Sequence, residues 1–112
     1  MSGANLITSS ELPIASLTNA TAISNGASLD NKSCRANHTA QALSSAGVTA
    51  GTVQLQGSLD GVSWFNIGAA LNINAAGAVF QGSSGATPAR FIRAQITATI
   101  TGGTVTVFIG SA

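Results

Sequence analysis

The sequence predicts an all-β fold, a two-sheet antiparallel sandwich of the jelly-roll or Greek-key type. Three observations predict it. Apolar and polar residues alternate along much of the C-terminal half, and turn residues recur at intervals of about eight to twelve residues. In addition, no window carries a helical stripe of large apolar residues. The length of 112 residues fits one such domain, expected over residues 21–112 and preceded by an arm over residues 1–20.

Residues 1–20 do not share the alternation. Their apolar residues stand without a repeating period among Ser, Thr and Asn, and they are Leu6, Ile7, Leu12, Ile14 and Leu17. Pro13 lacks the N–H that regular strand pairing requires. This pattern predicts an extended arm whose apolar residues contact another surface. The alternative is that the same residues form the first strand of the sandwich.

The strand pattern becomes clear in the middle of the chain. A short strand is predicted at residues 27–29, and residues 38–43 alternate with His38, Ala40 and Ala42 on one side. From Val53 to Leu59 the apolar residues face the expected core. Asp60-Gly61 then predicts a tight hairpin turn with positive φ at both residues, and residues 62–67 would form the returning strand.

The last third continues this pattern. Residues 71–73 and 78–81 are predicted as a second hairpin, and residues 82–88 as an irregular loop ending in a proline. The longest alternation follows, with Ile92, Ala94, Ile96, Ala98 and Ile100 on the core side. Gly102-Gly103 is expected to turn the chain back into a final strand with Val105, Val107 and Ile109 facing inward.

Charge is scarce in this chain. Only 6% of the residues are charged, whereas soluble domains carry about 25%. Four scattered basic residues cannot form the cationic stripe that phosphate backbones require, so we expect no nucleic-acid partner. A neutral surface also gives little repulsion between copies, which favours a component of a larger assembly.

The N-terminus has no basic and apolar signal-peptide pattern, and no apolar run is long enough to span a membrane. We therefore expect synthesis in a cytoplasm and no membrane partner. Cys34 is the only cysteine, so no internal disulfide can form.

Catalytic chemistry has few candidates. His38 is the sole histidine, no nucleophile-elbow motif is present, and the three acidic residues are dispersed. Cys34 and His38 alone cannot complete the four ligands of a structural zinc site. The sequence thus predicts a protein that is not an enzyme and holds no metal or cofactor, with His38 making ordinary hydrogen bonds at a strand end.

Two aromatic residues carry alternative interpretations. Trp64 and Phe65 are adjacent and therefore point to opposite faces of a strand, so one ring is expected in the core and the other outside. Trp64 is predicted as the core residue, with Asp60 serving the turn; the alternative is a glycan platform formed by Trp64, Phe65 and Arg90. Arg90 and Arg93 are expected to pair with Asp60 or Asp30, or to contact a neighbouring subunit.

Three segments together resemble small β-sandwich modules in the structural proteins of tailed bacteriophages: VQLQGSLDGVSWFNIG (53–68), PARFIRA (88–94) and GGTVTV (102–107). The resemblance spans residues 37–109. It implies a capsid decoration or cement protein, or a fibre-associated piece. In that reading the chain is a virion protein on the outer capsid surface, with the major capsid protein and itself, as a homotrimer, for partners. The arm residues, Arg90 and Arg93 would make the contacts.

The ARFIRA strand also resembles the corresponding strand of discoidin-like, galactose-binding jelly rolls. Here Phe91 stands where that pattern commonly has Tyr, and no acidic loop cluster for calcium is present. The alternative function is accordingly a carbohydrate-binding module for host attachment.

Overall fold

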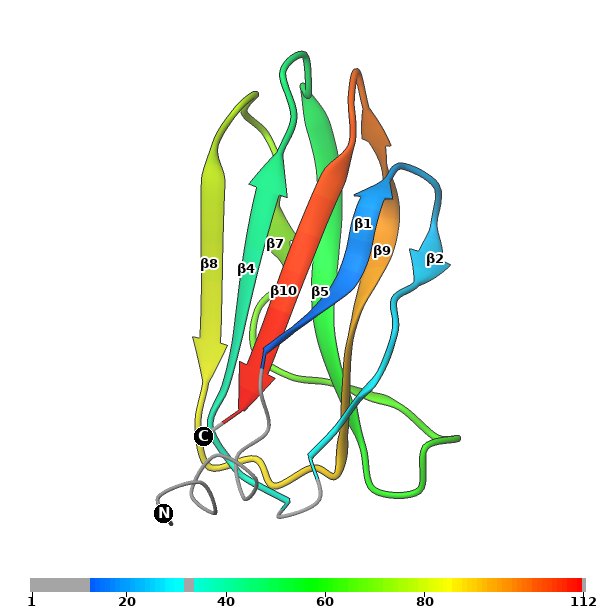
Figure 1. Ribbon diagram of the computed structural model, residues 1–112, viewed down its shortest axis with the longest axis vertical. Helices are drawn as coiled ribbons and strands as arrows, with labels where there is room; N and C mark the ends of the chain where they lie inside the picture. The colour runs from blue at the N-terminus through cyan, green and yellow to red at the C-terminus, as the bar shows by residue number, and fades with distance from the viewer. Residues whose placement is uncertain (1–12, 32–33, 112) are drawn as a thin grey trace, which may run out of the picture.

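The computed structural model describes residues 13–31 and 34–111. Within these ranges the chain forms two antiparallel sheets that pack face to face and contains no helix, which confirms the predicted all-β sandwich (Figure 1).

One sheet has four strands and the other has six. The four-stranded sheet contains, in spatial order, β1 (Ile14–Ala20), β10 (Val105–Ser111), β4 (His38–Ser44) and β8 (Val79–Ser84). The six-stranded sheet is built around β9 (Phe91–Thr101) and β5 (Ala50–Ser58). Two short strands, β2 (Ser24–Asn25) and β3 (Leu29–Asp30), extend it beyond β9, while β6 (Phe65–Asn66) and β7 (Leu71–Asn72) extend it beyond β5.

The long strands alternate between the sheets along the chain. β4, β8 and β10 belong to one sheet, whereas β5 and β9 belong to the other. The hairpin predicted over residues 71–81 is therefore wrong, because β7 and β8 lie in different sheets. The turn expected at Gly102-Gly103 is present, and it joins β9 of one sheet to β10 of the other.

The core is aliphatic. Among the described residues, its buried apolar members are Leu, Ile, Val and Ala side chains from both sheets, and the partly buried Phe80 packs against them. The inward positions predicted for β10 and for most of β9 are confirmed, since Ile92, Ile96 and Val107 are fully buried. Ala98 is exposed instead, at a point where the pairing of β9 with β5 shifts register.

The first strand lies inside the range predicted as an arm. Ile14–Ala20 pairs with β10, and Leu17 is only 5% exposed within the core. For these residues the arm prediction is wrong and the alternative of a first strand is correct. Pro13 precedes the strand and so removes none of its hydrogen bonds, while two register shifts accommodate the irregular apolar spacing. Leu6, Ile7 and Leu12 lie outside the described residues.

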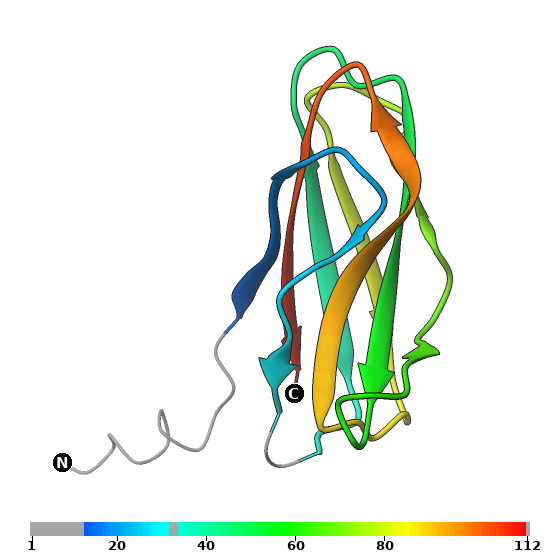
Figure 2. The same ribbon diagram turned by 90° about the vertical axis from the view of Figure 1, so that its right-hand side faces the viewer.

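Ser16 links β1 to the six-stranded sheet and closes one edge of the sandwich. Its Oγ donates to the Ala27 carbonyl at 2.7 Å and accepts from the Ala94 N–H at 2.9 Å. Gly26 lies against Ser16 and the Ala94 carbonyl with no room for a side chain, because a Cβ on Gly26 would lie 2.2 Å from the Ser16 Oγ. Figure 2 shows β1 and the 21–30 segment running beside β9 at this edge.

At the upper end in Figure 1, the loop before β5 meets the loop between β9 and β10. Gly102 has φ +86°, and a Cβ there would lie 2.2 Å from the Gly47 carbonyl oxygen. The two loops thus pack backbone against backbone, which only glycine allows at this position.

Candidate functional site

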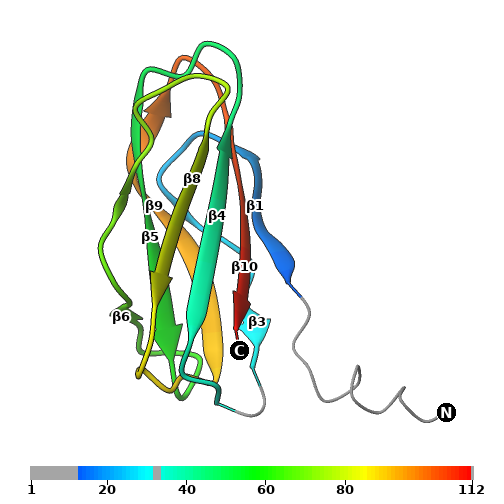
Figure 3. The ribbon, with the colours of Figure 1, turned by 90° about the vertical axis from the view of Figure 1, so that its left-hand side faces the viewer.

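The outer face of the four-stranded sheet carries no charged residue. The strand pairing places its outward residues in three rows, each with one residue from β8, one from β4 and one from β10 in that order. The first row is Val79, Leu43 and Thr106, the second is Gln81, Gln41 and Phe108, and the third is Ser83, Thr39 and Gly110. Ala15 of β1 lies beside Phe108. We call this set the uncharged face; Figure 3 shows the strands that carry it side by side. Val79 is 62% and Phe108 37% exposed, so apolar surface lies among the amides and hydroxyls.

A shallow groove of about 330 Å³ crosses the lower part of the uncharged face. It is lined by Pro13, Thr39, Gln41, Gln81, Phe108, Ile109 and Gly110. Gly110 has no side chain in the groove, and the Pro13 ring lies 3.6 Å from the position that a Cβ on Gly110 would take.

The charged residues of the described ranges lie elsewhere. Asp30 and Arg93 lie in β3 and β9 of the six-stranded sheet. Asp60 follows β5, Arg90 precedes β9, and Arg35 lies in the loop before β4. Arg90 pairs with Asp30 as predicted, with Nε 3.2 Å from Oδ1, and this hydrogen bond raises the pKa of Arg90. Both side chains are well exposed, so the pair orients the arginine without contributing much stability.

Asn31 is buried beneath this charged end. Its Nδ2 donates to the carbonyl oxygens of Ala89 at 3.0 Å and Arg35 at 3.2 Å, and its backbone N–H donates to the Arg90 carbonyl. The side chain is fully buried, and Oδ1 has no partner within the described part of the chain. Asn31 therefore holds the loop before β4 against the start of β9.

Trp64 lies outside the core, which corrects the prediction for this residue. Its ring stacks on the guanidinium of Arg93 at 4.0 Å, on the outer face of the six-stranded sheet. Arg93 Nε donates to Gln56 Oε1 at 3.0 Å, and Gln56 Nε2 donates to Asn66 Oδ1 at 3.1 Å. Burial under the indole lowers the pKa of Arg93.

Phe65 is also outside the core and is 39% exposed. Neither ring therefore fills the interior, because the aliphatic side chains of the two sheets already do so. Of the three residues proposed for a glycan, Trp64 stacks on Arg93, whereas Arg90 lies over Phe91 at 5.1 Å.

The predicted tight turn at Asp60-Gly61 is a longer loop over residues 59–64. Asp60 Oδ1 accepts the backbone N–H groups of Val62 and Ser63, each at 2.8 Å, and the Ser58 hydroxyl at 2.9 Å. Gly61 has φ +78°, but Asp60 does not have positive φ. Because the chain leaves β5 at Ser58, Leu59 is 64% exposed instead of facing the core.

The hydrogen bonds from Ser63, Val62 and Ser58 lower the pKa of Asp60 to about 2. The unfolded value is higher, so the stabilisation is complete above about pH 4 and is lost as the pH falls toward 2. We expect the Val62 and Ser63 amide resonances to titrate with a midpoint near 2 by NMR. Asp60→Asn should abolish this titration; an Asp60 midpoint near the unperturbed value would contradict the assignment.

His38 is buried and uses both ring nitrogens. Nε2 lies 2.7 Å from the Thr87 carbonyl oxygen and must donate to it, while Nδ1 lies 2.8 Å from the Ser111 hydroxyl. The bond to Ser111 joins the start of β4 to the end of β10, and the bond to Thr87 joins it to the loop between β8 and β9, as predicted for a histidine at a strand end. Within residues 13–31 and 34–111, no group of three His, Cys, Asp or Glu side chains is placed to hold a metal ion.

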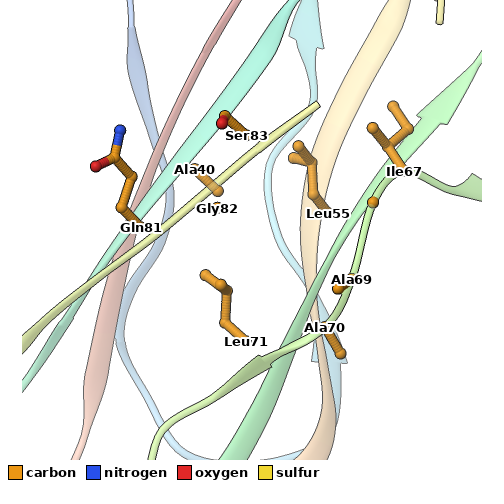
Figure 4. A pocket seen from close by; sticks show the side chains of 10 residues that line it. Ala40, Leu55, Ile67, Ala69, Ala70, Leu71, Gln81, Gly82 and Ser83 are labelled. Atoms are coloured by element: carbon orange, nitrogen blue, oxygen red, sulfur yellow. The ribbon is translucent and has the colours of Figure 1, made fainter. Parts of the chain in front are cut away.

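A pocket of about 280 Å³ opens at the edge opposite β1, between β8 and the β6–β7 segment. Its floor is apolar, with Leu55, Ile67 and Leu71, and Leu71 points toward Gly82 of β8 (Figure 4). None of the residues lining it is charged or is a His or Cys. The pocket therefore offers space for apolar groups but no acid, base or metal ligand.

Sequence reasoning missed the residues that make the uncharged face distinctive. The alternation within β10 correctly predicted that Phe108 points outward, but it gave no reason to expect Phe108 and Val79 of β8 on the same face. That grouping depends on β4 pairing with both strands, over separations that local pattern does not reveal.

No helix in the described residues is long and apolar enough to cross a membrane.

No protein-family model matches the chain, and no curated protein matches it. Among solved structures it is similar to the crystal structure of the SPBc2 prophage-derived protein YomS, with a TM-score of 0.63 and 9% sequence identity. The likeness covers 90% of this chain and 92% of that chain, and at this identity it shows a shared fold alone.

Proposed function

We propose that this chain is a non-enzymatic structural protein of a tailed-phage virion, a capsid decoration protein that binds the outer shell and stabilises it. In this proposal it is assembled in the host cytoplasm, binds the major capsid protein as a homotrimer, and needs no cofactor, nucleic acid or membrane. The sequence resemblance to phage structural modules supports the proposal, as does the shared fold with a prophage-derived protein.

The observation that carries the proposal is the uncharged face. Burying charged groups in an interface is costly unless each is paired, whereas hydroxyls, amides and small apolar groups lose less on desolvation. Such a face suits docking against protein, and repeated modest contacts become strong when several copies bind one shell. Leu6, Ile7 and Leu12 are proposed to add apolar contacts. Leu17 no longer qualifies because it is buried in the core.

A pair of lysine substitutions tests this assignment. Val79 and Val62 are both exposed valines, but Val79 lies on the uncharged face and Val62 on the lower loop. We expect Val79→Lys to reduce the affinity for purified shells about tenfold or more, which is ~1.4 kcal/mol for each copy. Val62→Lys should leave the number of bound copies unchanged. Equal occupancy for both variants, measured by quantitative gel analysis of purified particles, would remove the uncharged face from the proposal.

The second candidate function is a carbohydrate-binding module for host attachment. The observation that favours it is the position of Trp64 on the outer face, beside Arg93 and the Gln56 and Asn66 amides. Aromatic faces and amide groups are suited to sugar rings. Glycan-array binding that disappears in Trp64→Ala, at unchanged thermal stability, would favour this function over the first.

A further inference from the structure

The outer edge of β8 carries unpaired backbone groups. β8 is the last strand of the four-stranded sheet, on the side opposite β1 (Figure 1). Where β4 pairs with this strand, the Ser44 N–H donates to the Ala78 carbonyl at 3.0 Å. Hydrogen-bonded positions alternate along an antiparallel pair, so every second residue after Ala78 bonds to β4 and the residues between them point their N–H and C=O groups to the free edge. These residues have no backbone partner within residues 13–31 and 34–111, and they are Val79, Gln81 and Ser83.

The other edges of the sandwich are blocked or short. β1 has two register shifts, and its Ser16 carbonyl already accepts the Ala27 N–H at 2.7 Å. The strands at the margins of the six-stranded sheet, β2, β3, β6 and β7, have two residues each. β8 has six residues without a proline or a charge, and it pairs with β4 without a register shift. Since proteins usually protect a long edge by one of these devices, the edge of β8 is available to pair with another chain.

The apolar pocket of about 280 Å³ opens along this same edge. Gly82 of β8 lines it on one side, and Leu55, Ile67 and Leu71 line its floor (Figure 4). Residues that lie opposite each other in paired strands point to the same face of a sheet, so the residue opposite Gly82 on an added strand would point inward. Its side chain would enter the pocket and cover the three aliphatic residues, which removes apolar surface from water.

We infer that β8 receives an extended, uncharged segment of another protein as a fifth strand of this sheet, with apolar residues at the alternate positions that face the pocket. The free backbone groups of the edge specify an extended chain, and the pocket gives specificity for its inward side chains. A charged residue at those positions would find no opposite charge, because none of the lining residues is charged. The segment lies beside the uncharged face and not on it, so the inference stands whether or not that face binds a shell.

Two isomeric peptides test the inference on the native full chain. Both are acetylated and amidated, contain alternating threonine and leucine, and have about seven residues, which is long enough to pair with all of β8. One is N-methylated on its leucines and the other on its threonines. With the leucines facing the pocket, only the first peptide can donate hydrogen bonds to the edge. We expect it to bind saturably and the second to bind at least about tenfold more weakly, because a hydrogen bond is lost at each threonine.

Amide hydrogen exchange, followed by NMR, locates the bound peptide. In the free chain the Gln81 and Ser83 amides should exchange rapidly, whereas the Gly82 amide is protected by its bond to β4. Saturation with the first peptide should slow the exchange of Gln81 and Ser83 by about tenfold or more. The second peptide should leave it unchanged at the same concentration.

Variants of the chain provide a second comparison. Gln81→Pro removes an N–H of the free edge, leaves the bonds to β4 in place and puts a ring in the path of the added strand, so the first peptide should bind about tenfold more weakly. Gln81→Thr keeps the N–H and should bind as the parent protein does. If Gln81→Pro does not fold, Ala70→Asp places a charge at an exposed position of the pocket, with Ala76→Asp in the turn before β8 as its control.

Several outcomes would overturn the inference. They include equal binding of the two peptides, no protection by the first peptide at millimolar concentration, and undiminished binding to a folded Gln81→Pro or Ala70→Asp variant. Protection of Gln81 and Ser83 without any peptide would also overturn it. If that protection faded on dilution, the edge would belong to a second copy, and if it did not, to the same chain.

Discussion

Gly102→Ala is expected to lower the free energy of unfolding by about 2–5 kcal/mol. The left-handed backbone conformation costs an alanine about 1–2 kcal/mol, and overpacking adds about 1–3. The second contribution arises because the new methyl group would lie 2.2 Å from the Gly47 carbonyl oxygen, a backbone atom that cannot rotate away. The melting temperature, measured by calorimetry, should fall by roughly 10 °C or more.

Gly77→Ala is the matched control. Gly77 also has positive φ, +58°, but no atom lies within 4 Å of a Cβ built there. It should therefore show only the conformational cost, about 1–2 kcal/mol. Equal losses in the two variants would mean that the loops around Gly47 and Gly102 are not in backbone contact.

Asn31→Asp is the second change with a large expected effect, a loss of about 3–5 kcal/mol at neutral pH. The substitution keeps the shape of the side chain but points a carboxylate oxygen at the Ala89 and Arg35 carbonyl oxygens, to which Asn31 now donates. Asn31 is fully buried, so water cannot solvate the new charge.

The destabilisation caused by Asn31→Asp should depend on pH. Burial and the facing carbonyls raise the pKa of the new carboxyl in the folded state above its unfolded value of about 3.9. The penalty is then small below the unfolded pKa, where the group is protonated in both states, and it grows as the pH rises toward neutrality. Urea titrations at pH 4 and 7 measure this difference. As a control, Asn31→Ala should lower the free energy of unfolding by about 1–3 kcal/mol and keep the pH dependence of the parent protein. If Asn31→Asp and Asn31→Ala showed the same pH dependence, the buried position of residue 31 would be contradicted.

Local pattern predicted the strands well where one face is buried. His38, Ala40 and Ala42 lie inward as expected, and so do Val105 and Val107, because alternation follows directly from the pleat of a half-buried strand. Strand partners were not predictable in this way. β5 pairs with β9 across some forty residues, and β1 with β10 across the whole domain, so Gly102-Gly103 looks like a hairpin turn although it carries the chain between sheets.

The candidate sites show the same limit. Asp60-Gly61 signals a turn, but Asp60 can satisfy backbone N–H groups two and three residues ahead, and this widens the turn into a loop. The widening shifts the register after it and exposes Leu59. The adjacency of Trp64 and Phe65 on a strand predicted one ring inside and led to Trp64 as the core residue. Its outward position depends on the pairing of β5 with β9, which brings Arg93 beside Gln56 and so places the guanidinium that the indole covers.

The lone indole on the six-stranded sheet gives this protein a built-in optical reporter. With one tryptophan and no tyrosine, nearly all near-ultraviolet emission comes from Trp64, whose ring stacks on the Arg93 guanidinium. A ligand that settles on that side should quench or shift the emission, while a partner that covers the opposite side should leave the spectrum unaltered. Fluorescence during titration can therefore tell which side of the molecule is in use before any contact is mapped.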